Sequence, residues 1–170
     1  MALKHTNMKS IEFPFLPEGR TIEYVPIDNP FIQAAKEFAR EHSLDKTMPT
    51  GAAIVIFGEV IGLGANGSDY HELHGCERVK NNVPTGTGYD LCEGCHPKNH
   101  AEAKAIQSIK DSGKNPEGAD LYLWGHWWCC ESCWQKMIDA GINKVFLAEE
   151  SEVLFNKNAD GNIVGHQFES

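Results

Sequence analysis

The sequence of 170 residues lacks any long apolar run. Its longest one covers residues 52–57, far short of the roughly 20 apolar residues that a membrane-spanning helix needs. The chain is also poor in basic residues, with 15 Lys and Arg against 24 Asp and Glu and a formal net charge of −9. Such a chain repels a phosphate backbone. We therefore expect neither a membrane protein nor a protein that binds long nucleic acid.

Internal repeats and low-complexity segments are absent, and the first residues are not followed by the apolar stretch of a secretory signal. We therefore expect a cytoplasmic protein. With 41% hydrophobic and 23% charged residues, the chain has the composition of one globular domain. Because the cytosol is reducing, its six cysteines are expected to bind metal or to act in catalysis rather than to form disulfides.

The order of the expected elements indicates an α/β sandwich. Residues 1–28, which contain several prolines, are interpreted as an extended N-terminal arm, and residues 29–170 as a single domain. Apolar spacing and capping residues predict helices over 30–42, 100–112 and 131–140 and strands over 52–57, 60–63, 121–124 and 144–147. Helices placed between strands in this way favour a central mixed sheet flanked by helices. Residues 151–170 are expected to add a final hairpin or a tail.

Residues 67–99 form the most unusual segment of the chain. They lack apolar periodicity and are rich in His, Cys, Gly, Asn and Pro. A loop of this length in a compact domain is usually functional or is held by something other than packing. We expect a bound metal to hold it.

A first group of metal-ligand residues lies at two predicted helix starts. Cys130 and Cys133 are three residues apart, so they share one face of the first helical turn, where the helix dipole favours thiolates. His100 opens another helix, and a buried strand joins the two helices. Three protein ligands leave the fourth tetrahedral position for water, as in a catalytic zinc site. Glu102 is then placed to carry the protons of that water.

This pattern matches a known signature. His-x-Glu followed by Pro-Cys-x-x-Cys is typical of zinc deaminases, and the stretches 100–102 and 130–133 fit it apart from the proline, which Cys129 replaces. The alternatives are a chance coincidence or a thioredoxin-like redox pair, which would leave His100 and Glu102 without roles. Cys129 is interpreted as a buried thiol, because a fourth thiolate would occupy the position that the reacting water needs.

Residues 120–147, in which the cysteines open a helix, resemble the cytidine deaminase superfamily. Residues 49–52, which lead into a hairpin, and the stretch 64–68 are similar to the strand pair and substrate loop of its deoxycytidylate deaminases. The match spans residues 29–148. It implies a three-layer sandwich with a central mixed five-stranded sheet. It also implies hydrolytic deamination of a cytosine at C4, with Glu102 moving protons to N3 and to the leaving amine.

The resemblance also implies substrate contacts, for which the candidates are Asn66, Ser68, Ala101, Lys104, Trp127 and Trp128. Asn66 would hydrogen-bond the nucleotide sugar, although from local sequence it is equally an ordinary turn residue. The backbone N–H of Ala101 would bind the pyrimidine carbonyl. Lys104 stands where nucleotide enzymes of the family have Asn, and it either pairs with a substrate phosphate or points to water. The two tryptophans are interpreted as walls of the pocket, with core packing as the alternative.

A second group of cysteines lies within residues 67–99. Cys92 and Cys95 form another Cys-x-x-Cys, and Cys76 precedes them. With one histidine they match a Cys3His structural zinc site, as in some deoxycytidylate deaminases that this region resembles. His74 is the preferred fourth ligand and His71 the alternative. The metal would supply the order that burial cannot; otherwise these are three reduced thiols in a mobile loop.

The expected function is therefore zinc-dependent deamination of a free cytosine nucleotide, above all dCMP. A small nucleotide is the expected partner, because Arg78, Lys80 and Lys98 suit a phosphate clamp better than a polynucleotide groove. One alternative is deamination of another base or nucleoside, namely cytidine, guanine, a pterin-like base or tRNA adenosine. Another is a noncatalytic zinc-binding interaction module, against which Glu102 argues. The family commonly forms oligomers, so a homo-oligomer is expected.

Overall fold

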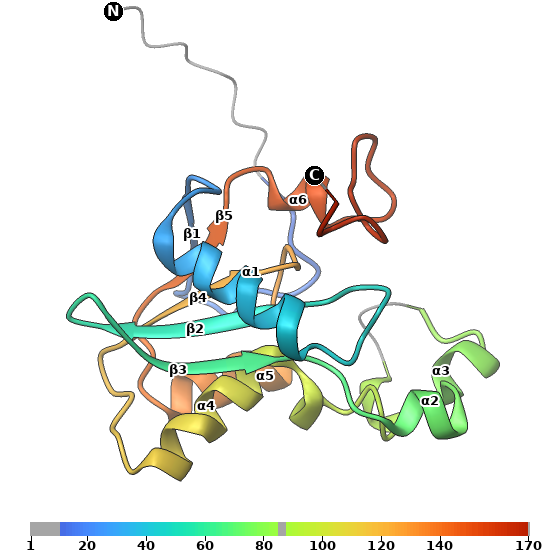
Figure 1. Cartoon of the computed structure of the whole chain (residues 1–170), viewed down its shortest axis with the longest axis horizontal. Coiled ribbons are helices and arrows are strands. Elements are labelled where there is room, and N and C mark those ends of the chain that lie inside the picture. Colours follow the sequence, from blue (N-terminus) through green and yellow to red (C-terminus); the bar gives the residue numbers. More distant parts are fainter. Residues whose placement is uncertain (1–10, 85–87, 170) are drawn as a thin grey trace, which may run out of the picture.

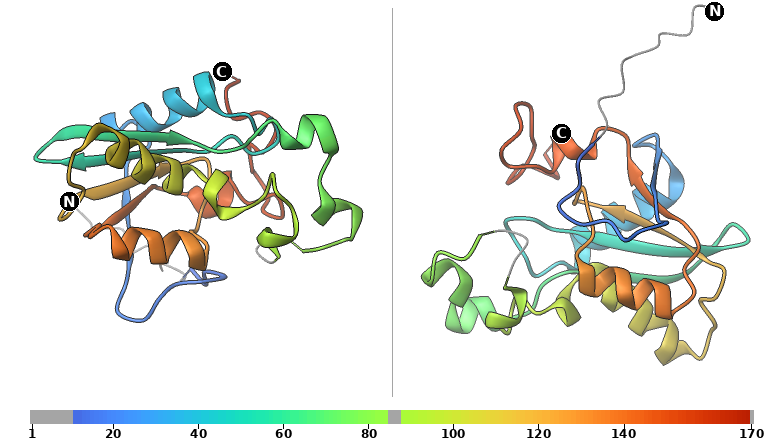
Figure 2. Two further views of the ribbon diagram at one scale, coloured as in Figure 1. Left: turned by 90° about the horizontal axis from the view of Figure 1, so that it is seen from below. Right: turned by 180° about the vertical axis from the view of Figure 1, so that it is seen from behind.

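The computed structural model describes residues 11–84 and 88–169 of the chain. A five-stranded sheet in the order β1-β5-β4-β2-β3 carries helices on both faces (Figures 1 and 2). Its strands are β1 (Ile22–Val25), β2 (Gly51–Ile56), β3 (Glu59–Ala65), β4 (Asp120–Trp124) and β5 (Val145–Ala148). The α-helices are α1 (Pro30–His42), α2 (Tyr70–His74), α3 (Glu77–Lys80), α4 (Ala101–Ser112), α5 (Glu131–Asp139) and α6 (Ser151–Leu154). Two short 3-10 helices are η1 (Tyr89–Leu91) and η2 (Pro97–Asn99).

The sheet is mixed. β5 lies between β1 and β4 and runs parallel to both, whereas β2 is antiparallel to β4 on one side and to β3 on the other. The β2–β3 turn at Phe57 and Gly58 has positive φ at both residues, as the tight turns of hairpins require. The predicted α/β architecture with a mixed five-stranded sheet between helices is confirmed.

Helix α1 covers one face of the sheet. Asn29 caps it by accepting hydrogen bonds from two backbone N–H groups of the first turn, at 2.9 and 3.3 Å, and Pro30 takes the first helical position. Its buried residues are Ile32, Ala35 and Ala39. A Cβ on Gly51 of β2 would lie 2.0 Å from the carbonyl oxygen of Ala35. Glycine at this position therefore allows α1 to lie directly on the strand.

Helices α4 and α5 cover the opposite face, over the larger core. The big buried side chains there are Ile54, Ile109, Leu121, Leu123, Trp134, Met137 and Leu147. A Cβ on Gly64 of β3 would lie 2.3 Å from the carbonyl oxygen of Ala101 and 2.3 Å from the backbone nitrogen of Ala105. The missing side chain brings the first turn of α4 onto the end of β3. This contact places the start of α4 beside the turn that follows β3.

Three segments differ from the elements that the sequence pattern predicts. Residues 22–25 of the expected arm form the edge strand β1, whose Ile22 pairs with Val145 of β5. Four residues are too few to show a period, and the partner strand is distant in the sequence, so local pattern could not reveal it. Residues 151–169 contain α6 and turns rather than a hairpin. No helix in the described part of the chain is long and apolar enough to span a bilayer.

The third difference lies in residues 67–99, which we call the loop segment. It contains α2, α3, η1 and η2 and extends sideways beyond the end of β3 (Figure 1). Three of its large apolar side chains are exposed, with fractions of 70% for Leu73, 75% for Val79 and 59% for Leu91. Short helices therefore form in this segment without an apolar core of their own.

Candidate functional site

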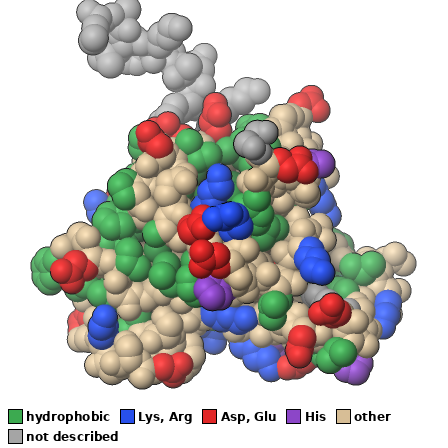
Figure 3. All heavy atoms as spheres, viewed as in Figure 1, with side chains coloured by type: hydrophobic (Ala, Val, Ile, Leu, Met, Phe, Trp, Pro, Cys, Tyr) green, Lys and Arg blue, Asp and Glu red, His purple; other side chains and the backbone are tan. Residues whose placement is uncertain are grey.

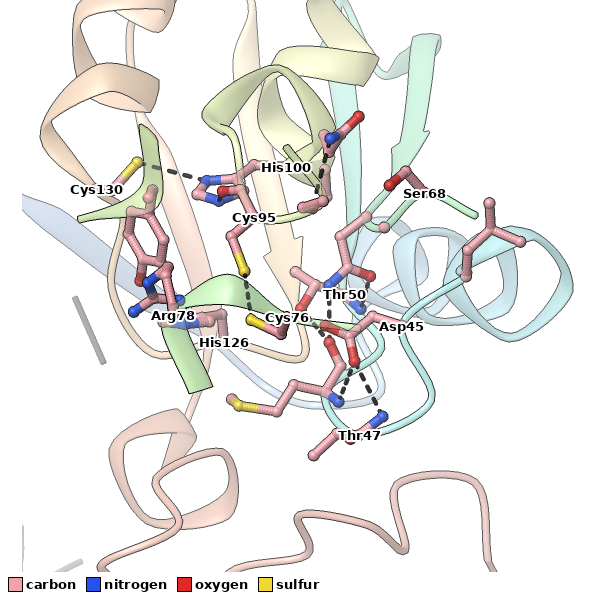
Figure 4. A pocket seen from close by; sticks show the side chains of 18 of the residues that line it. Asp45, Thr47, Thr50, Ser68, Cys76, Arg78, Cys95, His100, His126 and Cys130 are labelled. Atoms are coloured by element: carbon pink, nitrogen blue, oxygen red, sulfur yellow. Dashed lines mark hydrogen bonds between the residues drawn. The ribbon is translucent and has the colours of Figure 1, made fainter. Parts of the chain in front are cut away.

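The first group of metal ligands lies where the N-terminal ends of α4 and α5 meet. The structure brings His100, Cys130 and Cys133 together, with their ligand atoms all within 4.8 Å of one another. Nδ1 of His100 lies 3.5 Å from Sγ of Cys130 and 3.4 Å from Sγ of Cys133 (Figure 4 shows the first contact). One imidazole and two thiols fit a tetrahedral zinc ion that keeps one open position.

The helix starts favour a charged sulfur in this group. Cys130 is the N-cap of α5, and its Sγ accepts a hydrogen bond from the backbone N–H of Cys133 at 3.4 Å. The interaction with the Cys133 side chain, followed by that with His100, holds the pKa of the Cys130 thiol well below its ordinary value. The Cys130 sulfur raises the pKa of Cys133 in turn. The pair therefore presents a thiolate to a metal already at neutral pH.

The opposite edge of the His100 ring is held from the loop segment. Its Nε2 lies 3.2 Å from the carbonyl oxygen of Cys95, and the ring of Tyr89 packs edge-on with centroids 5.0 Å apart. Because a carbonyl oxygen only accepts hydrogen bonds, Nε2 carries a proton, which leaves Nδ1, the nitrogen that faces the sulfurs, to bind a metal. This is the tautomer that a metal-binding histidine needs.

Glu102 lies in the first turn of α4, two residues after His100. Its side chain is 5% exposed, and it lines the same cavity as the histidine. Burial raises the pKa of its carboxyl group. A carboxyl group with a raised pKa can accept a proton and give it back, so this position suits a general acid and base.

A cavity of about 470 Å³ opens beside these residues (Figure 4). Its walls come from residues 44–50, from residues 66–68 after β3, from residues 75–79 around the start of α3 and from residues 126–130 before α5. This volume lies within the range of small-molecule sites. The cavity is therefore bounded on one side by the sheet with its packed helices, which we call the sheet body, and on the other by the loop segment.

Asn66 lines the cavity, but most of its side chain is used inside the protein. Oδ1 accepts hydrogen bonds from the Ser43 hydroxyl at 2.6 Å and from the backbone N–H of Thr50 at 2.8 Å, and Nδ2 donates to the carbonyl of Met48 at 2.9 Å. Asn66 thus fastens residues 43–50 to the end of β3. One of the two hydrogens on Nδ2 of Asn66 is not used in these bonds and could be donated to a substrate.

The other expected contacts divide between the cavity and its surroundings. Ser68, Ala101 and Trp128 line the cavity. Ala101 stands at the first position of α4, where a backbone N–H has no partner within the helix. Trp127 is not among the described residues that line the cavity, and its ring lies 6.3 Å from that of Phe13. Of the two tryptophans, only Trp128 is placed as a wall.

Lys104 binds the protein itself. Its Nζ donates a hydrogen bond to the carbonyl oxygen of Gly67 at 2.6 Å, and burial lowers its pKa. Lys104 is partly buried and is not among the described residues that line the cavity. It ties α4 to the first residue of the loop segment.

His126 is a cavity residue that the sequence analysis did not select. Its Nδ1 accepts a hydrogen bond from the backbone N–H of Trp128 at 3.3 Å, so the proton of the neutral ring sits on Nε2. Removal from water, followed by the nearby His100, lowers its pKa to about 4. His126 is therefore a neutral imidazole with one N–H to donate. A polar residue four positions before Cys130 was the signal that could have found it.

Arg78 is the one member of the expected phosphate clamp that the described cavity wall contains. Its guanidinium lies over the ring of Tyr89, 4.4 Å from the centroid, and donates to the carbonyl of Pro84 at 2.8 Å. Lys80 and Lys98 instead contact a carbonyl and a carboxylate of their own segment. Arg78 therefore brings a permanent positive charge to the cavity.

The second group of cysteines also comes together. The sulfurs of Cys76, Cys92 and Cys95 lie within 4.8 Å of one another, and those of Cys76 and Cys95 are 3.5 Å apart (Figure 4). Cys92 is buried and the other two are partly exposed. Three sulfurs at this spacing fit a structural zinc ion that lacks one further ligand.

The preferred histidine ligand, His74, does not complete this group. His74 is exposed and packs against the ring of Tyr70 at 4.8 Å, outside the group that the described residues form. The side chain of His71 lies outside the described part of the structure. A carboxylate that the sequence analysis missed lies close by instead. Glu77 accepts a hydrogen bond from the Tyr70 hydroxyl and interacts with Cys92, and its Oε2 is buried without a hydrogen-bond partner in the described structure.

Solved structures include distant likenesses to this fold. The dCMP deaminase from the cyanophage S-TIM5, in its apo form, is 22% identical over 74% of this chain and 86% of that chain, with a TM-score of 0.47. The guanine deaminase from Bacillus subtilis is 24% identical over 69% of this chain and 61% of that chain, with a TM-score of 0.43. No curated protein sequence matches the chain. These comparisons do not choose a substrate.

The family itself is shown by the sequence match. Residues 26–149 match the model of the cytidine and deoxycytidylate deaminase zinc-binding region, and this range covers most of the chain. It includes both helix starts that hold His100, Cys130 and Cys133. The protein belongs to the cytidine and deoxycytidylate deaminase family and is a zinc-dependent hydrolytic deaminase.

Proposed function

We propose that this deaminase acts on a free cytosine nucleotide, above all dCMP, and produces dUMP and ammonia. The observation that carries the proposal is the position of buried Glu102 beside the ligand group of His100, Cys130 and Cys133, at the wall of one cavity. The resemblance of residues 29–148 to deoxycytidylate deaminases supports cytosine as the base. The cavity volume of about 470 Å³ suits a mononucleotide.

The residues around the cavity suit hydrolysis at a ring carbon. When zinc is bound by the two sulfurs and the imidazole, it supplies a water molecule of lowered pKa. Glu102 accepts a proton from water and delivers protons to N3 of the base and to the leaving amine, so that dCMP and water give dUMP and ammonia. The backbone N–H of Ala101 binds the pyrimidine carbonyl, and Trp128 closes one side of the base site.

Arg78 provides the proposed contact to the phosphate. Its guanidinium is held over Tyr89 at the cavity wall, where it can pair with a phosphate monoester. Lys104, the other basic candidate, is tied to the carbonyl of Gly67. A nucleotide is therefore favoured over a nucleoside or a free base.

A polynucleotide is a poorer fit than a mononucleotide. The chain carries a formal net charge of −9, and acidic and basic side chains lie interspersed on the face that Figure 3 shows. Long nucleic acid needs a continuous positive groove. The proposed partner is thus a small molecule. From the family resemblance we also propose that the protein forms a homo-oligomer and lies in the cytoplasm. Size-exclusion chromatography with light scattering tests the oligomeric state.

A second zinc ion, held by Cys76, Cys92 and Cys95, is part of the proposal. The three sulfurs have the spacing that one ion requires, and the loop segment around them lacks an apolar core. As its oxygen ligand we propose Glu77, whose carboxyl group interacts with Cys92 but does not lie within 4.8 Å of all three sulfurs.

Deamination of another base is the competing function. Cys129 replaces the proline of the family signature, and His126, a hydrogen-bond donor, lines the same cavity. These residues could change which base the site accepts. A purine or a pterin-like base would then be the substrate. The noncatalytic module is disfavoured, because a buried carboxyl group beside the ligand group serves no purpose in simple zinc binding.

The experiment is an ammonia-release assay of the zinc-loaded protein with dCMP, CMP, deoxycytidine, cytidine, guanine and adenosine, with zinc counted per chain. We expect the highest kcat/KM for dCMP. Preference for a purine would contradict the assignment of the base. Equal rates for dCMP and deoxycytidine would contradict the role of Arg78.

A further inference from the structure

We propose that the cysteine group of the loop segment orients the catalytic histidine, so that metal binding at the two ligand groups is coupled. The coupling passes through the peptide carbonyl of Cys95, which belongs to one group and accepts the hydrogen bond of His100, which belongs to the other. This inference rests on the second zinc ion of the proposed function. Cys95 is thus a positioning residue for His100.

The histidine ring is held at both of its nitrogens. Nδ1 faces the sulfurs of Cys130 and Cys133 at 3.5 and 3.4 Å, and Nε2 faces the Cys95 carbonyl at 3.2 Å. The partner of the outer nitrogen fixes the tautomer and the ring direction of a metal-binding histidine. If the carbonyl moves away, the proton can leave Nε2 for Nδ1, and the ring then offers no lone pair to the metal.

The short chain between the two groups is stiffened by its own hydrogen bonds. The N–H of Cys95 donates to the carbonyl of Cys92 at 3.1 Å, and Nδ2 of Asn99 donates to the carbonyls of Glu93 and Gly94 at 2.8 and 3.4 Å. The N–H of His100 closes the turn on Pro97 at 3.0 Å. A displacement of the cysteine sulfurs is therefore passed to the start of α4 rather than absorbed by a flexible linker.

Apolar packing does little to fix the loop segment. Among its described residues only Cys92 and Gly94 are buried. We expect one ion that joins the three sulfurs to fix Cys95, whereas without it only the hydrogen bonds of the segment hold the acceptor of His100. Outer partners of metal ligands typically change metal affinity by about 10- to 100-fold. Because coupling is reciprocal, each ligand group should strengthen the other by the same factor.

The test compares Cys92→Ser with the matched control Asp90→Asn, an exposed position two residues earlier. Zinc is counted per chain, and the affinity of the remaining site is measured by chelator competition. We expect Cys92→Ser to bind one zinc ion fewer than the wild type and to hold the remaining ion roughly 10- to 100-fold more weakly. Asp90→Asn should keep both the count and the affinity.

A spectroscopic measurement distinguishes a change in the orientation of the His100 ring from a general loss of order in the protein. With ¹⁵N-labelled histidine, the wild type should show His100 as the Nε2–H tautomer with a slowly exchanging proton, and Cys92→Ser should lose this signature. Circular dichroism and tryptophan fluorescence establish that the sheet body is folded in each variant.

A second variant leaves all six metal-binding side chains in place. Asn99→Ala removes the hydrogen bonds to Glu93 and Gly94, and we expect it to bind the same number of zinc ions while weakening the catalytic site. If Cys92→Ser does not fold, the zinc affinity of Asn99→Ala tests the coupling instead.

The possible outcomes are distinct. Unchanged affinity of the catalytic site in Cys92→Ser, or in Asn99→Ala when that variant is decisive, overturns the coupling. A wild-type count of one zinc ion per chain overturns it too, together with the second zinc site. Neither result touches the proposed deaminase function, which the turnover of dCMP by the wild type tests separately.

Discussion

The sheet body and the loop segment of residues 67–99 are held together in different ways. The body buries large apolar side chains on both faces of the sheet, among them Ile54, Leu121, Trp124, Trp134 and Leu147. The loop segment buries only Cys92 and Gly94 among its described residues and exposes leucine and valine side chains. The body is therefore stabilised by apolar burial, whereas for the loop segment we propose that a metal held by its three cysteine sulfurs takes this role.

The two regions contribute different residues to the site. The body supplies His100, Cys130, Cys133 and Glu102 from the starts of two packed helices, so these groups sit on rigid elements. The loop segment adds Arg78 and the hydrogen-bond partner of the histidine. In the proposed mechanism the reacting groups therefore come from the part stabilised by packing, and the phosphate contact comes from the part that we propose a metal holds.

The largest expected effect is on catalysis in the body. Replacing Glu102 by Gln should lower kcat by about 10²- to 10⁴-fold, because the proton carrier is lost. Zinc content should stay at the wild-type value, since Glu102 is not among the ligand group. Ammonia release and metal analysis measure both, with Glu117→Gln, an exposed position, as the control. Turnover retained by Glu102→Gln would remove this residue from the mechanism.

Metal removal should separate the two regions. After chelation, backbone amides of residues 70–80 and 89–99 should exchange with solvent at least about 10-fold faster, whereas amides of β2 and β4 should stay protected. Hydrogen exchange followed by mass spectrometry resolves these peptides. If the loop segment stays as protected as before, something other than metal holds it.

Matched leucine substitutions should show the same contrast in stability. Leu121→Ala in β4 should lower the free energy of unfolding by about 2–5 kcal/mol, because the side chain is fully buried. Leu73→Ala in α2 should change it by less than about 0.5 kcal/mol, because that side chain is 70% exposed. Chemical denaturation measures both. Equal losses would mean that Leu73 packs against a surface such as a second copy of the chain.

The last comparison concerns the phosphate. Arg78→Met should raise KM for dCMP by roughly 10- to 100-fold, the loss of a charge-assisted hydrogen bond of about 1.5–3 kcal/mol. KM for deoxycytidine should not change, and Lys80→Met, at an exposed position, is the control. Steady-state kinetics decide the matter. A rise in KM for both substrates would show that Arg78 shapes the cavity instead of binding phosphate.

The sequence pattern predicted the group of metal ligands that the structure brings together, because part of its geometry is local. Cys130 and Cys133 lie at the start of one helix, so their spacing predicts that they point together, whereas the deaminase signature implied that His100 and Glu102 join them. The long helices and the buried strands were predictable for a similar reason, since their apolar periods are continuous.

Contacts between distant segments could not be predicted in this way. Strand β1 depends on pairing with β5, more than a hundred residues later, and its four residues carry no period. Lys104 and Asn66 resemble a phosphate ligand and a sugar ligand in sequence, but the backbone groups that hold them come from other loops. The same holds for His126, whose tautomer is set by a backbone N–H.

The most direct test of the account is the turnover of dCMP by the wild-type protein with zinc counted in the same sample. The account predicts two zinc ions per chain and release of one ammonia for each dUMP formed. A protein with a full catalytic zinc site that releases no ammonia from dCMP would contradict it.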